Sequence, residues 1–248
     1  STTVFYTPVS GFSGIDSLTY TVSNGVLTNR ANVDAIVLPQ PDLIWENDSF
    51  DSLTVGPLNG QNGWTTVPGN ASPLVILDSA PNKSVQIDAA PGLPINVTKD
   101  VADQTGGRHS FTFRVRVDGA AHLPCEAAIE MQTDFSNGWS NKFRYCIGPR
   151  IAVNYSSSGA DTTIVTTTVP GQWYLIHTEI NLNTDLIDVY VDGLLKVSGL
   201  AVNTGPIRSL GITGQDPGGA GVVVVDNLTG VTANGISGGA GCGGGTGT

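Results

Sequence analysis

Glycine and proline interrupt this 248-residue chain at intervals of roughly 8 to 12 residues, and apolar and polar side chains alternate between them. The chain contains 32 glycines and 14 prolines, which leaves little room for long helices. A helix needs an apolar period near 3.6 residues and a strand a period of 2, so this alternation indicates strands joined by turns. β-Branched residues are also frequent, which favours strands. The sequence therefore predicts an all-β protein.

The charge balance excludes two classes of partner. Charged residues make up 13% of the chain, with 11 Lys and Arg against 21 Asp and Glu, which gives a net charge of −10. Nucleic acids and anionic membrane surfaces both attract clustered cations, so we expect neither as a partner. Apolar runs such as Val222–Val225 have the length of a strand, far below the roughly 20 residues of a membrane span. The low charge and the many Ser, Thr and Asn residues favour a secreted or cell-surface protein.

Composition predicts three regions, which are residues 1–40, 41–232 and 233–248. The first holds three strand-like runs, Thr3–Tyr6, Ser17–Val22 and Ala31–Leu38. The second holds a dozen or more strand-like segments, which suits a two-sheet antiparallel jelly-roll sandwich. The third is mostly glycine and cannot bury enough surface to become ordered alone, although it can order against a neighbouring chain.

The first region carries an Asp16-Ser17-x-x-Tyr20-x-Val22 run. This run resembles the C-terminal half of bacterial cadherin-like (immunoglobulin-like) repeats. The resemblance implies a partial immunoglobulin-like unit, because a complete sandwich needs about seven strands. Three strands leave one apolar face open. We therefore expect either a fragment of a longer chain or another surface that covers this face.

The second region also resembles a known family. Phe50–Gly56 followed by Asn59–Trp64 resembles the opening of bacterial concanavalin A-like jelly rolls. Gln172–Ile176 followed by Ile187–Gly193 resembles the laminin-G-like hairpin, and its Asp-Gly pair is a strong turn signal. Val222–Val231 resembles the closing strand of the same domains. The resemblance implies a concanavalin A-like jelly roll.

Three cysteines occur, and two of them lie 21 residues apart across a turn. Because disulfides persist in oxidising compartments, we predict a bridge between Cys125 and Cys146. The alternative is a pair of buried free thiols. Cys242 lies in the glycine tail, where it is free either to link to another chain or to stay unpaired.

One predicted strand carries a candidate site. Side chains alternate along a strand, so Glu126, Ala128, Glu130, Gln132 and Asp134 share one face. Concanavalin A-like glucanases place Glu-x-Asp-x-Glu on such a strand, with two carboxylates as nucleophile and acid/base. Here the middle position is Ala128 or, starting at Glu130, Gln132. We therefore expect no catalysis, and a solvated strand face as the simplest alternative to a binding site.

The next strand carries Lys142 and Arg144 on one face. Pairing Glu130 opposite Arg144 keeps both apolar faces inward and joins opposite charges. This register places the two bridging cysteines on opposite faces, which conflicts with the disulfide. A bulge near Pro124 would resolve the conflict.

Aromatic side chains are candidates for stacking on sugar rings. Trp139 lies in a predicted turn and is the best exposed candidate, whereas Trp45, Trp64 and Trp173 are expected in the core. Together with Glu126, Glu130, Gln132 and Arg144, Trp139 would form a carbohydrate-binding surface.

Metal sites are limited to one candidate. Asp48, Asp51 and Asp226 lie where the opening and closing strands would meet, and oxygen-rich acidic clusters suit a structural Ca²⁺ ion. The three histidines have no spacing that suggests zinc. We expect no other cofactor.

These observations favour an extracellular, non-catalytic structural or adhesive protein that self-associates, as in a surface filament or layer, or binds a neighbouring surface protein. Open strand edges and the glycine tail are the features that motivate it. The alternative is a carbohydrate-binding module of a larger secreted enzyme or adhesin, which would bind a polysaccharide. A third and weaker interpretation is an active glycoside hydrolase or lyase.

Overall fold

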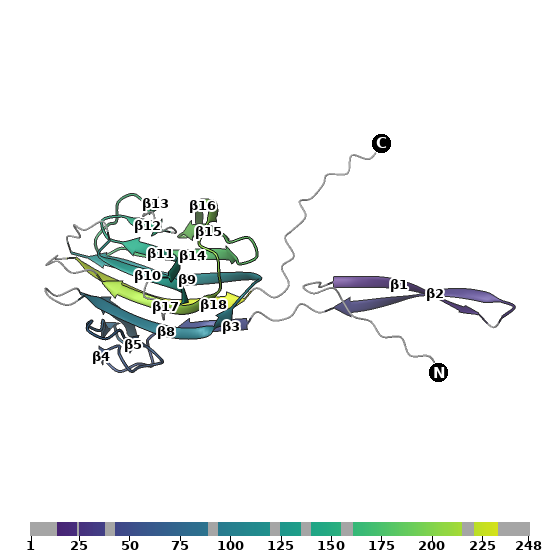
Figure 1. The fold of residues 1–248 in the computed structure, drawn as a ribbon, viewed down its shortest axis with the longest axis horizontal. Helices are drawn as coiled ribbons and strands as arrows, with labels where there is room; N and C mark the ends of the chain where they lie inside the picture. The colour runs from purple at the N-terminus through teal and green to yellow at the C-terminus, as the bar shows by residue number, and fades with distance from the viewer. Residues whose placement is uncertain are drawn as a thin grey trace. The chain divides into compact units, whose positions relative to one another are not determined.

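The computed structural model describes residues 14–23, 25–37, 43–88, 94–119, 125–134, 140–154, 161–214 and 221–232 (Figure 1). Every regular element in these ranges is a β-strand, which confirms the predicted all-β class. None of the described residues forms a helix with the length and apolarity needed to cross a bilayer. The chain divides into two units, the larger of which comprises Ile44–Thr232. Each unit is described by itself.

The smaller unit contains one antiparallel hairpin, β1 (Gly14–Ser23) and β2 (Thr28–Val37). Its register pairs Leu18 with Val33 and Tyr20 with Ala31. The predicted run Thr3–Tyr6 lies outside the described residues. The cadherin-like resemblance therefore stays a prediction.

In the larger unit, the described strands form two antiparallel sheets. The first is seven-stranded, in the order β13-β12-β11-β10-β17-β8-β5. Its strands are β5 (Thr65–Thr66), β8 (Ile95–Gln104), β10 (Ala127–Asp134), β11 (Ser140–Ile147), β12 (Ile151–Asn154), β13 (Asp161–Val165) and β17 (Ile207–Gly214).

The second sheet is nine-stranded, in the order β16-β15-β14-β9-β18-β7-β6-β4, and the remaining strand, β3, pairs with β18. Its strands are β3 (Leu43–Asp48), β4 (Gly56–Pro57), β6 (Leu74–Ser79), β7 (Asn82–Ile87), β9 (Arg108–Asp118), β14 (Trp173–Asn181), β15 (Leu186–Val191), β16 (Leu194–Ala201) and β18 (Val222–Thr232).

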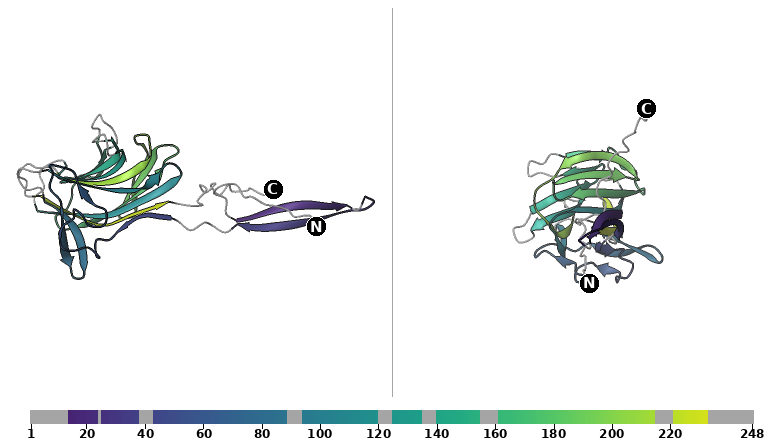
Figure 2. Two further views of the ribbon diagram at one scale, coloured as in Figure 1. Left: turned by 60° about the horizontal axis from the view of Figure 1, so that its bottom comes forward. Right: turned by 90° about the vertical axis from the view of Figure 1, so that its right-hand side faces the viewer.

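One hydrophobic core lies between the two sheets of the larger unit (Figure 2). Each strand contributes alternate residues to it, such as Ile129 and Met131 of β10 and Phe111 and Phe113 of β9. Aromatic rings extend across the core, since Phe113 packs edge-on against Tyr145 of β11 at 5.2 Å. The predicted two-sheet jelly-roll sandwich is confirmed.

Two of the tryptophans predicted in the core, Trp64 and Trp173, differ in burial. Trp64 is 1% exposed and fully buried. Trp173 instead lies half-buried on the outer face of β14, where the Arg114 and Arg116 guanidiniums stack on its ring at 4.9 and 4.7 Å. Predicting Trp173 in the core was wrong. Its neighbour Tyr174 takes the inward position, because the strand alternates in the opposite phase.

Candidate functional site: the polar face of the seven-stranded sheet

The outward face of β10 is polar and buried. Ile129 and Met131 enter the core, as the alternation predicts, while Glu130 and Gln132 point to the opposite side of the sheet. Glu130 is 1% and Gln132 6% exposed, and Glu126 and Ala128 are buried too. A solvated strand face, the alternative to a binding site, therefore does not hold for these four residues. Side chains from neighbouring strands crowd around these residues, and β10's own sequence does not reveal them.

Polar residues continue across this face from strand to strand. Glu130 lies opposite Arg144 of β11, which confirms the predicted register, and opposite Gly211 of β17. Further pairs extend the line in both directions, and we name these six residues the polar row. The polar row comprises Thr98, Gly211, Glu130, Arg144, Asn154 and Asp161, on β8, β17, β10, β11, β12 and β13.

A hydrogen-bond network fixes the centre of the polar row. Gln132 Nε2 donates to Glu130 Oε2 at 2.9 Å, and Ser209 Oγ donates to Gln132 Oε1 at 2.9 Å. Thr213 Oγ1 donates to Glu130 Oε1 at 3.4 Å. Burial raises the pKa of Glu130, and the hydrogen bond from Gln132 and the positive charge of Arg144 oppose that rise. Glu130 is therefore held rigidly in a partly dehydrated position.

Gly211 makes room for this network. A Cβ at Gly211 would lie 2.7 Å from Gln132 Nε2 and 3.1 Å from Glu130 Oε2. Any side chain at position 211 would therefore force the Gln132 amide to move, which would disturb its hydrogen bond to Glu130.

Several polar atoms near the polar row have no partner. Among the described residues, the half-buried guanidinium of Arg144 makes no hydrogen bond or ion pair, although the charge of Glu130 acts on it. Asn141 Oδ1 is buried and accepts no hydrogen bond, and the same holds for Asn96 Oδ1, next to Thr98 on this sheet. Buried polar groups are normally paired, so unpaired donors and acceptors on one face indicate where a ligand or water binds.

Lys142 behaves differently from its prediction. It was predicted to share one strand face with Arg144, which is half-buried, but Lys142 is fully buried. Its Nζ donates to Asp185 Oδ1 at 2.6 Å and to the carbonyls of Asn203 and Gly205 at 2.8 and 2.9 Å. The cause is a register shift in the β10–β11 pair next to Met131, which frees Lys142 from strict alternation.

Asn203, whose carbonyl accepts a hydrogen bond from Lys142, also contacts Asn141. Asn203 Nδ2 donates to the Asn141 carbonyl at 2.8 Å, and Asn203 N donates to the Lys142 carbonyl at 3.1 Å. Lys142 thus positions one side of the polar face through Asn203. No local sequence pattern predicts the contacts of Lys142, because their partners lie 43 to 63 residues away along the chain.

The two cysteines next to this face form a disulfide. Cys125 is bonded to Cys146, with their Cα atoms 4.8 Å apart. Cys125 precedes the first residue of β10, so strand alternation does not fix its direction, and the conflict with the Glu130–Arg144 register disappears. Cys242 and Trp139, the predicted stacking residue, lie outside the described residues.

The glucanase pattern at the start of β10 is incomplete. Ala128 lies between Glu126 and Glu130, at the position that the pattern gives to an aspartate. The absence of catalysis therefore stays a prediction.

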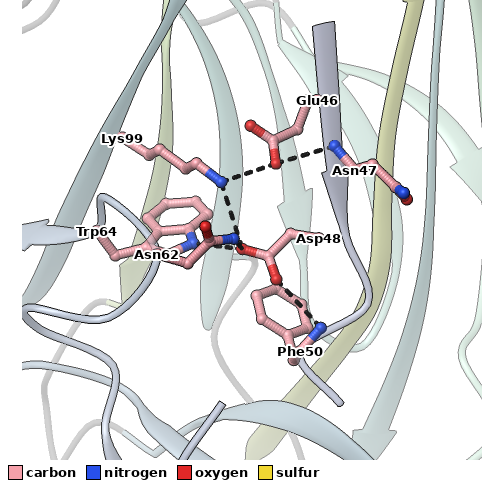
Figure 3. Close-up of polar contacts among 7 residues, drawn as sticks. All are labelled: Glu46, Asn47, Asp48, Phe50, Asn62, Trp64 and Lys99. Atoms are coloured by element: carbon pink, nitrogen blue, oxygen red, sulfur yellow. Dashed lines mark hydrogen bonds and ion pairs between the residues drawn. The ribbon is translucent and has the colours of Figure 1, made fainter. Parts of the chain in front are cut away.

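The predicted calcium ligand Asp48 belongs to a buried charge network instead (Figure 3). Its Oδ2 accepts hydrogen bonds from Trp64 Nε1 at 2.9 Å and Asn62 Nδ2 at 3.0 Å, and Lys99 Nζ lies 3.5 Å away. Lys99 also pairs with Glu46 at 2.9 Å. This network ties β3 and the Asn62–Trp64 segment to β8, and neither Glu46 nor Lys99 was predicted from the sequence.

The other two predicted ligands are separate from Asp48. Asp51 Oδ1 accepts a hydrogen bond from the Lys83 backbone N–H at 2.8 Å. Asp226 Oδ1 accepts one from the Asn227 backbone N–H at 2.8 Å. Burial raises the pKa of Asp226 to about 6, and the negative charge of Asp51 adds to the rise. In the described part of the chain, no three acidic, His or Cys side chains lie close enough to hold a metal.

The predicted set of Asp48, Asp51 and Asp226 was therefore wrong as a ligand cluster, because each carboxylate already accepts hydrogen bonds elsewhere. Calcium itself stays a prediction.

No protein-family model and no curated protein matches this sequence. Solved structures do. A sialidase is similar at 12% identity with a TM-score of 0.58, over 88% of this chain and 21% of the sialidase chain. This chain thus spans about a fifth of that protein. At such identity the similarity shows the fold alone.

Two further solved structures have the same fold over nearly their full length. One, from work on endo-acting O-glycanases of the human gut microbiota, has 14% identity and a TM-score of 0.52, over 77% of this chain and 100% of that chain. The other is described as a carbohydrate esterase of the Shiga toxin-encoding bacteriophage phi24B, with 13% identity and a TM-score of 0.51, over 72% and 99%.

Proposed function

We propose that the larger unit is a non-catalytic carbohydrate-binding domain, and that the polar face of the seven-stranded sheet is its binding site. The unpaired donors and acceptors beside the polar row are the observation that carries this proposal. Sugar hydroxyls both donate and accept hydrogen bonds, so they can satisfy the Arg144 N–H groups and Asn141 Oδ1 together.

The buried network supplies the rigidity that such a site needs. Glu130, Gln132 and Ser209 are fixed by hydrogen bonds before any ligand arrives. A preorganised polar site binds more tightly because few side chains must be ordered on binding. In this arrangement the buried residues form the floor, and the half-buried Arg144 and Asn141 make the first contacts.

The solved structures with this fold support the proposal by analogy only. Their printed descriptions name a sialidase, O-glycanases and a carbohydrate esterase, all proteins that act on glycans. A shared fold hosts many functions, so the site chemistry carries the argument. The Cys125–Cys146 bridge supports an extracellular location, where disulfides persist.

Affinity electrophoresis against a panel of soluble polysaccharides tests the proposal. We expect retarded migration on at least one polysaccharide, lost in an Arg144→Gln variant. The matched control is Lys196→Gln, which removes a cation from an exposed position on β16 in the other sheet. Retardation that persists in Arg144→Gln but is lost in the control variant would contradict this placement of the site.

Self-association remains a second candidate, favoured by the β1–β2 hairpin. Val33 of β2 is 45% exposed, and a two-stranded hairpin is marginally stable in water without a packing partner. Light scattering at increasing concentration tests it, and a mass that stays monomeric at all concentrations would exclude it.

A further inference from the structure

We propose that the polar face selects neutral glycans and rejects acidic ones, an inference that rests on the proposed function. The ligand class follows from which atoms lack partners and from the charges beside them. Both sets of observations come from the six strands that carry the polar row.

The unpaired atoms require a ligand that donates as well as accepts. Asn141 Oδ1 and Asn96 Oδ1 are buried acceptors without a donor, while Arg144 offers donors without an acceptor. A hydroxyl group can serve both kinds of atom. An ionised carboxylate only accepts, so it would satisfy Arg144 and leave the asparagine oxygens unpaired. Unpaired buried acceptors disfavour binding.

The local charge acts in the same direction. Arg144 lies directly opposite Glu130, so a carboxylate bound to Arg144 would compete with Glu130 for the same guanidinium. The next cation along the row, Arg150, is already paired with Asp161 at 2.7 Å. Asp100 adds another exposed carboxylate, since it pairs with Ser209 beside the polar row.

The charge of the whole chain adds a long-range contribution. A net charge of −10 lowers the encounter rate with polyanions, and the effect weakens as salt screens it. Neutral polysaccharides are insensitive to this field.

Matched polymers provide the test. Methyl-esterified and de-esterified polygalacturonan share one backbone and differ in their carboxylates, and β-glucan, galactan and alginate extend the comparison. Isothermal titration at low and at 0.5 M salt (about 3–5 Å Debye length) measures each affinity. We expect the affinity for neutral polymers to be at least about tenfold higher than for their acidic partners. The affinity for the acidic polymers should rise in high salt.

Two outcomes overturn the inference in distinguishable ways. Equal or tighter binding of the acidic polymer, weakened by salt, contradicts the selectivity while leaving carbohydrate binding intact. No binding to any polymer contradicts the proposed function itself.

A Glu130→Gln variant sharpens the test. It removes the competing charge while retaining the hydrogen-bond geometry, so we expect the neutral-over-acidic ratio to shrink severalfold. An unchanged ratio in Glu130→Gln would show that Glu130 does not set the selectivity. Lys196→Gln is the control and should leave the ratio unchanged.

Discussion

Gly211 and Glu130 lie directly opposite each other on β17 and β10, and Gly211 is the residue whose missing side chain admits the Glu130–Gln132 hydrogen bond. The pair joins the two central strands of the polar face. A glycine in a strand usually weakens it, so its place here marks a close approach of other groups.

Substituting Gly211→Ala should therefore disrupt the site. The new methyl group would contact Gln132 Nε2 at 2.7 Å, and we expect a loss of about 1 to 3 kcal/mol in stability. Polysaccharide binding should fall more than stability alone explains, because the network holds the binding residues. Urea unfolding and affinity electrophoresis measure the two effects. A variant with native stability and native binding would show that the close contact relaxes freely.

The buried ammonium of Lys142 gives a second prediction. Lys142→Met leaves Asp185 and two carbonyl oxygens without their donor, so we expect a loss of about 3 to 5 kcal/mol in urea unfolding. The control is Arg208→Met, which breaks the exposed ion pair with Asp103 and should cost at most about 1 kcal/mol. Equal effects of the two substitutions would contradict the role assigned to burial.

The charge network of Figure 3 gives a prediction about stability. Lys99→Met leaves Glu46 and Asp48 as neighbouring buried carboxylates without their cation. We expect a loss of about 3 to 5 kcal/mol in the free energy of unfolding, because removing one partner of a buried ion pair leaves its charged partners uncompensated. Urea unfolding of the wild type and the variant measures this loss. A loss below about 1 kcal/mol would contradict the role assigned to Lys99.

Asp226 gives a prediction of opposite sign to that of a typical paired carboxylate. Its pKa is raised from 3.8 to about 6, so the folded state binds the proton more tightly than the unfolded state does. The resulting stabilisation is complete below pH 3.8 and disappears as pH rises through about 6.

Asp226→Asn should thus be more stable than the wild type at pH 7.5, by about 1 kcal/mol after allowing for partial hydration. The advantage should vanish at pH 4. Differential scanning calorimetry across this range measures it, and a variant less stable than the wild type at pH 7.5 would contradict the assigned cause.

The disulfide supplies the last prediction. Replacing both Cys125 and Cys146 with serine removes a cross-link that spans 21 residues, which should cost about 2 to 4 kcal/mol. A reducing agent should lower the stability of the wild type by the same amount as the double substitution does. It should leave the stability of the variant unchanged. An equal effect of the reductant on both proteins would exclude the bridge.

Much of the fold followed from local patterns. The alternation of β10 and β11 predicted which side chains enter the core, and it predicted Glu130 opposite Arg144. The strands β3, β4 and β5 were not predicted. Of these, β4 and β5 have only two residues each. Strands that short carry no detectable period.

The site was predicted only in part. Glu130, Gln132 and Arg144 were identified from one strand and its neighbour, but Ser209, Thr213 and Gly211 were not. Those three lie on β17, about 80 residues further along the chain. Their role depends on β17 pairing with β10, which no local pattern specifies.

By itself, the sequence determined the class of the fold and the inward phase of β10, because the two-residue period of a strand is a property of adjacent residues. Only the tertiary structure decided that the face of Glu130 is buried, that Lys142 reaches Asp185, and that Asp48 binds Trp64 and not a metal cluster. Burial and pairing depend on which distant segments come together, and that is set by the packing of the whole sandwich.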